Sequence, residues 1–167
     1  METNKINTFV QLSLKDKHQY IYDIFKKSNS SDALTILEYI LSIPYDDKPV
    51  HALFVNLLCV TLAKTHSSDY LEYIVKAKRY GDCFCYVDSN LLFEFYNSID
   101  EKDPIGNTIN KWKDYIINET TPDWIIKYID LTTYYSNNYE NDLIFKQREK
   151  YESLEFHNYC LDIFKFY

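Results

Sequence analysis

Apolar residues in the first third of the chain recur at intervals of three and four, the spacing that lines one face of an α-helix. Two such stripes are present: Tyr20, Ile21, Ile24 and Phe25, then Leu34, Leu37, Ile40 and Leu41. Ser13 precedes the first stripe, with Asp16 in the position that completes a capping box. Ser30 and Ser31 precede the second stripe, and Pro44 follows it. The pattern predicts one helix that begins after Ser13 and a second helix capped at Ser30 or Ser31.

The next segment differs, because residues 52–62 are apolar on nearly every side. A helix without a polar face must be enclosed by others, so we expect this one at the centre of the domain. Pro49 is expected in its first turn, where no backbone N–H is needed. A fourth helix is expected to open at His66-Ser67-Ser68-Asp69 and to have Gly81 as its C′ residue.

Helical spacing also marks the second half of the chain. It resumes at residues 91–96, at 105–116 and after Thr121-Pro122-Asp123, where a cap is followed by a proline. Two segments stay ambiguous: residues 82–87 suit a short strand or a buried loop, and residues 140–167 suit one helix, two helices or a terminal strand. We predict a single all-α domain over residues 1–167, with about eight helices in antiparallel pairs.

A weak internal repeat bears on how these helices are arranged. Ser30-Ser31-Asp32-Ala33-Leu34 returns 37 residues later as Ser67-Ser68-Asp69-Tyr70-Leu71. A period in the thirties with one cap per period is typical of stacked helical hairpins. The Tyr-Ile pairs of the chain do not keep this register, so the echo supports an architecture and not a strict repeat. It favours a short α-solenoid-like stack over a compact bundle.

The charge balance narrows the choice of partner. The chain holds 25 acidic and 18 basic residues, which gives a net charge of −7. A nucleic-acid-binding protein usually presents a basic stripe, because neutralised phosphates supply most of its affinity. We therefore expect no direct nucleic-acid partner, whereas an acidic surface would attract a basic protein.

No pattern in the chain supports an enzyme, a cofactor or a metal. The histidines, His18, His51, His66 and His157, are scattered and are expected at helix ends or on the surface. The cysteines lack the C-x-x-C spacing of zinc and redox sites, so we expect buried structural thiols. Phosphate-binding loops need clustered glycines, and the chain has two glycines.

Localisation is expected to be cytoplasmic. The start of the chain, Met1 to Asn7, is polar and leads into an amphipathic segment, so no secretory leader is predicted. The longest apolar stretch, residues 52–63, is shorter than the roughly 20 residues that span a bilayer, so no membrane contact is predicted.

Acidic residues interleaved with tyrosines form the candidate partner-binding surface. They fall in the turns that close successive hairpins, so a regular stack would place them along one edge. Tyrosine supplies contact area at low entropic cost, and carboxylates suit a cationic cleft. The candidate residues are Tyr45, Asp46, Asp47, Tyr80, Asp82, Tyr86, Asp88 and Glu94. The alternative for each is a helix cap or a solvated turn.

In size, acidity and paired helices the chain resembles the helical-repeat (HEAT- or armadillo-like) immunity proteins of bacterial polymorphic toxin and contact-dependent growth inhibition systems. The resemblance is one of type and is carried by no motif. It implies a non-enzymatic protein that neutralises a cognate toxin domain, often a basic nuclease, by binding over its active site.

Two other classes remain open. One is a viral host-interaction protein with a Bcl-2-like helical bundle, which would use an apolar groove; the usual Asn-Trp-Gly-Arg groove motif is absent. The other is a scaffolding helical-repeat module. An exposed apolar groove would favour the viral alternative, and an acidic, tyrosine-lined edge favours the immunity protein.

Overall fold

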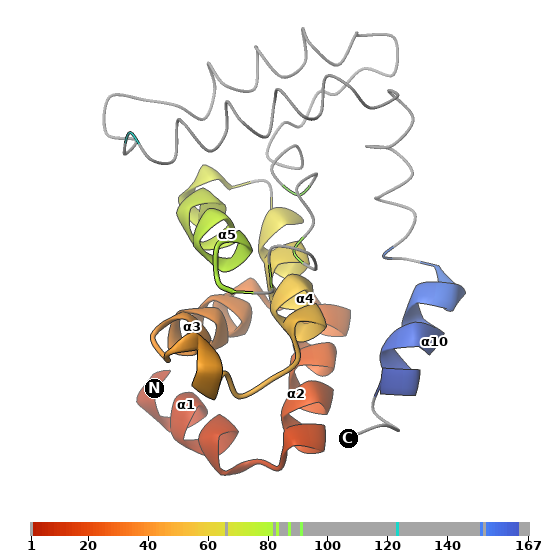
Figure 1. The fold of residues 1–167 in the computed structure, drawn as a ribbon. Coiled ribbons are helices and arrows are strands. Elements are labelled where there is room, and N and C mark those ends of the chain that lie inside the picture. The colour runs from red at the N-terminus through yellow and green to blue at the C-terminus, as the bar shows by residue number, and fades with distance from the viewer. Residues whose placement is uncertain are drawn as a thin grey trace, which may run out of the picture.

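The computed structural model describes residues 2–65, 67–81, 83, 87, 91, 123, 151 and 153–163 (Figure 1). The elements of this part are α1 (Glu2–Gln11), α2 (Leu14–Lys27), α3 (Ser30–Leu41), the 3-10 turn η1 (Tyr45–Asp47), α4 (Ala52–Ala63), the 3-10 turn η2 (Ser68–Tyr70), α5 (Leu71–Lys78) and α10 (Leu154–Ile163). The described chain contains helices and no strand, which confirms the predicted all-helical class. None of its helices has the length and apolar character needed to cross a membrane.

Helix α4 is the centre of the fold, as its sequence predicts. Every residue from Ala52 to Ala63 is buried, and none of them is charged. The helix packs against α2, α3 and α5, which surround it in Figure 1. A fully buried Leu, Val or Phe side chain contributes roughly 1.5–3 kcal/mol relative to an exposed one. Burial of α4 is therefore the main term that holds these helices together.

The first helix, α1, is not among the elements predicted from the sequence. Phe9 anchors it, with no exposed surface and with its ring 5.8 Å from that of Tyr20 and 6.1 Å from that of Tyr39. Lys5 adds an ion pair with Asp32 of α3. The helix is hard to predict from the sequence because residues 1–7 are polar and one large aromatic residue, Phe9, makes most of its contact with the core.

The cap predicted for α2 is confirmed, and the cap predicted for α3 is wrong. Ser13 caps α2 as predicted: its hydroxyl accepts from the Asp16 N–H at 3.2 Å and donates to the Asp16 carboxylate at 2.6 Å. Helix α3 is capped by Asn29, whose side-chain oxygen accepts from the Asp32 N–H at 3.1 Å, and not by Ser30 or Ser31. The reason is the short connection, because Ser28 turns left-handed (φ 51°) and leaves the extended position to Asn29.

Three further boundaries differ from expectation. The fourth helix is not capped at residues 67–69: Ser68 begins the 3-10 turn η2, and α5 begins at Leu71 after Tyr70, which makes no side-chain cap hydrogen bond. Pro49 precedes α4 instead of lying in its first turn; the helix begins at Ala52 with His51 as its cap, because Val50 is drawn into the core at 2 % exposure. Gly81 has the expected positive φ of 56°, but it lies two residues beyond the cap residue Arg79 of α5 and is not the C′ residue.

Helix α10 settles the last part of the ambiguous tail, because residues 154–163 are helical. It lies beside α2 (Figure 1), with the Tyr22 hydroxyl 2.8 Å from His157 Nδ1 and the rings of Phe25 and Phe156 6.3 Å apart. Asn56 of α4 donates to the Tyr151 hydroxyl at 3.3 Å. The helices predicted within residues 91–140 lie outside the described residues, and so does most of the segment 82–87.

Candidate partner-binding edge

The turn after α3 and the turn after α5 meet at one edge of the molecule. The rings of Tyr45 and Tyr80 are 5.6 Å apart and nearly perpendicular, at 82°. The Tyr80 hydroxyl donates to the backbone carbonyl of Ile43 at 2.8 Å. Burial is the main cause that raises the pKa of Tyr80 above its usual value, so the phenol keeps the proton that it donates.

Tyr45 is held in place from two further sides. Lys48 donates to its hydroxyl at 3.1 Å, and the same ammonium lies 4.3 Å from the ring centroid. Gly81 lies directly under the ring, where a Cβ atom would overlap the ring carbons. Gly81 also has a positive φ, which most other residues adopt only at a cost. The glycine therefore provides both the turn and the room that Tyr45 occupies.

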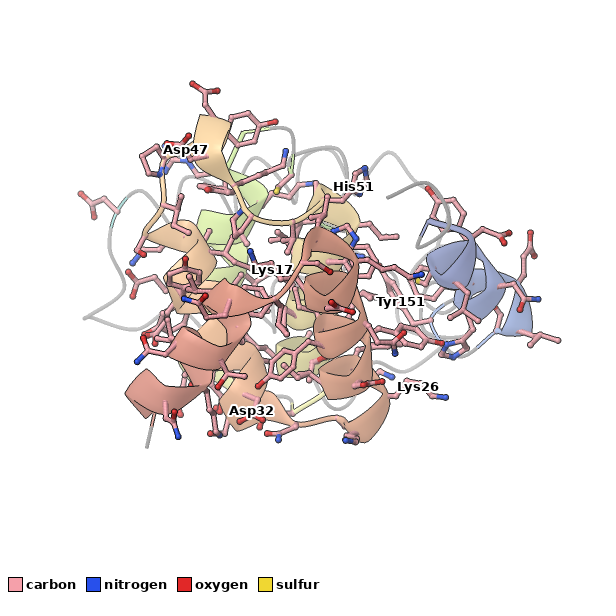
Figure 2. The ribbon with its side chains drawn as sticks, turned by 90° about the horizontal axis from the view of Figure 1, so that it is seen from below. Lys17, Lys26, Asp32, Asp47, His51 and Tyr151 are labelled. Carbon is pink, nitrogen blue, oxygen red and sulfur yellow. The ribbon has the colours of Figure 1, made fainter. Side chains whose placement is uncertain are left out.

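Two carboxylates project beside these rings. Asp46 and Asp47 belong to η1 and are exposed, whereas Tyr45 and Tyr80 are half-buried. Figure 2 shows Asp47 on the outer loop of the molecule, far from Lys26 on α2. We call Tyr45, Asp46, Asp47, Lys48, Tyr80 and Gly81 the tyrosine edge. It combines the two fixed aromatic rings with the exposed carboxylates of η1.

Half of the residues predicted for partner binding can be placed. Tyr45, Asp46, Asp47 and Tyr80 share the tyrosine edge. Asp82, Tyr86, Asp88 and Glu94 lie outside the described residues. Sequence reasoning missed Lys48, and the available signal was its position three residues after Tyr45 in the same turn. A role in partner binding stays a prediction for all eight residues.

A second polar cluster is buried where α2 meets the start of α4, and the sequence analysis did not predict it. His18 has no exposed surface, and its ring is stacked on Phe54 with centroids 4.0 Å apart and planes 5° apart. Its Nε2 accepts from the His51 N–H at 3.0 Å. Burial, and then His51, lowers the pKa of His18 to about 4. We call His18, His51 and Phe54 the histidine joint.

The expected position of His18 at a helix end or on the surface is therefore wrong. The residue lies on the face of α2 that also carries Ile21 and Phe25, three and seven positions later, and this spacing was the available signal. His51 does lie at a helix end, as the cap of α4.

The described thiols are buried and unreactive in character. Cys59, Cys83 and Cys160 are free and buried. Burial raises the pKa of Cys160 to about 11 and raises that of Cys59 further, so both stay protonated at neutral pH. Among the described residues, no three His, Cys, Asp or Glu side chains are grouped as metal ligands.

Comparison with known proteins assigns no relative to this chain. No known protein family, curated protein or solved structure matches it.

Proposed function

We propose that this protein is a non-enzymatic acidic binding protein, an immunity protein that neutralises a cognate toxin by tight binding over the toxin's active site. The observation that carries the proposal is the tyrosine edge. Two tyrosine rings are locked together there, beside the exposed carboxylates of Asp46 and Asp47.

The locked rings favour binding because little conformational freedom remains to be lost. Tyr45 is confined by Lys48 and Gly81, and the hydroxyl of Tyr80 is tied to the Ile43 carbonyl. Immobilising a side chain at an interface costs roughly 0.5–1.5 kcal/mol, and a ring that is already fixed avoids part of that cost. Preorganised tyrosines supply large contact areas in many protein interfaces.

The charge of the chain favours a basic partner. The net charge is −7, and Asp46 and Asp47 extend the negative field to the outer loop. Opposite charge raises the rate of diffusional encounter more than it raises the affinity. A basic toxin domain, such as a nuclease, fits this surface, and the mechanism requires neither a cofactor nor direct contact with nucleic acid.

The remaining features of the proposal concern the whole chain. We expect one cytoplasmic domain of about eight helices in antiparallel pairs. In that arrangement Asp82, Tyr86, Asp88 and Glu94 extend the tyrosine edge and complete the binding surface. The proposal therefore includes residues on both sides of Gly81.

The decisive experiment uses the gene beside the one that encodes this chain. Its product is expressed alone and together with this protein, and growth is measured. An immunity protein restores growth and binds the purified toxin domain one to one. A neighbouring product without toxicity, or toxicity that this protein does not relieve, overturns the proposal.

Two matched variants then locate the surface. Asp46→Lys with Asp47→Lys should slow association by about tenfold at low salt and weaken its salt dependence. Asp23→Lys with Glu155→Lys makes the same change in net charge on exposed positions of α2 and α10 and should change the rate much less. Equal effects in surface plasmon resonance would mean that the edge is not the docking surface.

A further inference from the structure

The start of α4 depends on a hydrogen bond that only a neutral histidine can accept. The His51 N–H donates to His18 Nε2 at 3.0 Å, so this nitrogen carries a lone pair and not a proton. The imidazole has no exposed surface and lies flat on Phe54. The imidazole is therefore out of contact with water while the joint is closed.

His51 links this contact to the chain on either side of it. It is the cap of α4, and its Nδ1 accepts from the Leu53 N–H at 3.2 Å. The preceding residue, Val50, is buried at 2 % exposure. The histidine joint thus sets where the segment from Lys48 to His51 leaves the tyrosine edge and enters the core.

The surroundings of His18 oppose a positive charge. Helix α4 carries no charged side chain from Ala52 to Ala63, and its positive N-terminal end faces the imidazole. The pKa of His18 is lowered first by burial and then by the charge of His51, and both effects oppose a proton on the imidazole.

We propose that His18 is an acid-sensitive latch. Protonation turns Nε2 from an acceptor into a donor that faces the His51 N–H, and the loss of this hydrogen bond releases residues 48–51 from α2. The helices around α4 stay packed when the latch opens, because their contacts are apolar and do not titrate. This inference concerns the free protein and does not depend on the function proposed above.

The test follows the latch residue by residue as the pH falls. Amide hydrogen exchange and the imidazole signals of His18 are measured by NMR between pH 7 and pH 3. We expect the protection of the His51 amide to fall at least tenfold, in step with protonation of His18, while the far-UV circular dichroism stays helical. In His18→Gln the side-chain oxygen can still accept the hydrogen bond but does not titrate, so the protection should stay level.

A second variant separates the two histidines. His51→Ser keeps a capping side chain and the backbone N–H but removes the second imidazole, so it should retain the pH dependence. The latch is overturned if His51→Ser loses the pH dependence of this amide protection. It is also overturned if the wild-type protection stays level while His18 titrates, or if His18→Gln loses protection as much as the wild type does. Unfolding of the whole protein in step with the His51 amide also overturns it. If His18→Gln does not fold, the test compares two midpoints in the wild type: the pH at which the His18 imidazole titrates and the pH at which the His51 amide loses protection. Midpoints that differ overturn the latch.

Discussion

The histidine joint and the tyrosine edge bound the same segment, residues 43–51, and they differ in burial. At each end an aromatic side chain bonds the backbone: His18 accepts from the His51 N–H, and Tyr80 donates to the Ile43 carbonyl. His18 and Phe54 of the joint have no exposed surface, whereas Tyr45 and Tyr80 at the edge, like His51, are half-buried. One end of the segment is fixed in the core, and the other end lies at the surface.

The difference shows how burial changes the value of similar contacts. A hydrogen bond contributes about 0.5–1.5 kcal/mol, but a buried group left without its partner costs about 1–3 kcal/mol. At the edge, water can replace a lost partner. At the joint it cannot, so removal of a side chain there should cost more stability than the same truncation at the edge.

The largest effect is expected from Phe54→Ala, which breaks the joint. Phe54 has no exposed surface and supports the His18 ring, so its loss leaves a cavity in the core. The free energy of unfolding should fall by about 3–5 kcal/mol, measured by urea denaturation. Tyr45→Ala at the half-buried edge is the matched aromatic truncation and should cost much less. Comparable losses from the two variants would contradict the division between anchor and edge.

The second effect is the part of the pH dependence of stability that comes from the joint. The pKa of His18 is about 4 in the folded protein and 6.5 for an ordinary histidine. Between these values the unfolded chain binds a proton that the folded chain does not. The contribution of His18 to the free energy of unfolding is therefore fully present above pH 6.5 and is lost as the pH falls toward 4. The loss should approach about 3 kcal/mol.

The measurement compares wild type with His18→Gln by urea denaturation at pH 7 and pH 4.5. Carboxylates contribute equally to both proteins, so the difference between their slopes isolates His18. His157→Gln removes a histidine at the α2–α10 contact and serves as the control. A wild-type slope no steeper than that of His18→Gln would contradict the prediction.

The smallest effect is expected from Gly81→Ala at the edge. The new Cβ overlaps the Tyr45 ring, and the alanine must adopt a positive φ. Together these two effects should lower the free energy of unfolding by about 1–2 kcal/mol. Because a half-buried ring can move aside, the fold should survive while the fluorescence or NMR signals of Tyr45 change. In a double-mutant cycle with Tyr45→Ala, the cost of Gly81→Ala should shrink. Strict additivity would mean that the ring is not what the glycine accommodates.

Much of the helical core could be predicted because its signals are local. The stripe on α2 and the cap at Ser13 involve residues within a few positions of one another, and α4 is apolar all round. The internal repeat was a poorer guide, because its two serine segments differ in the structure: Asn29 caps α3, whereas Ser68 begins the 3-10 turn η2 that precedes α5.

What only the tertiary structure decided depends on residues distant along the chain. His18 is buried because α4 lies over it, 33 residues before its hydrogen-bond partner His51. Tyr45 needs the space left by Gly81. Periodicity assigns a residue to a face but does not say which ring or backbone group meets it there. The sequence by itself therefore determined that this protein is helical, with α4 inside, and packing decided which polar groups were enclosed and which turn stayed at the surface.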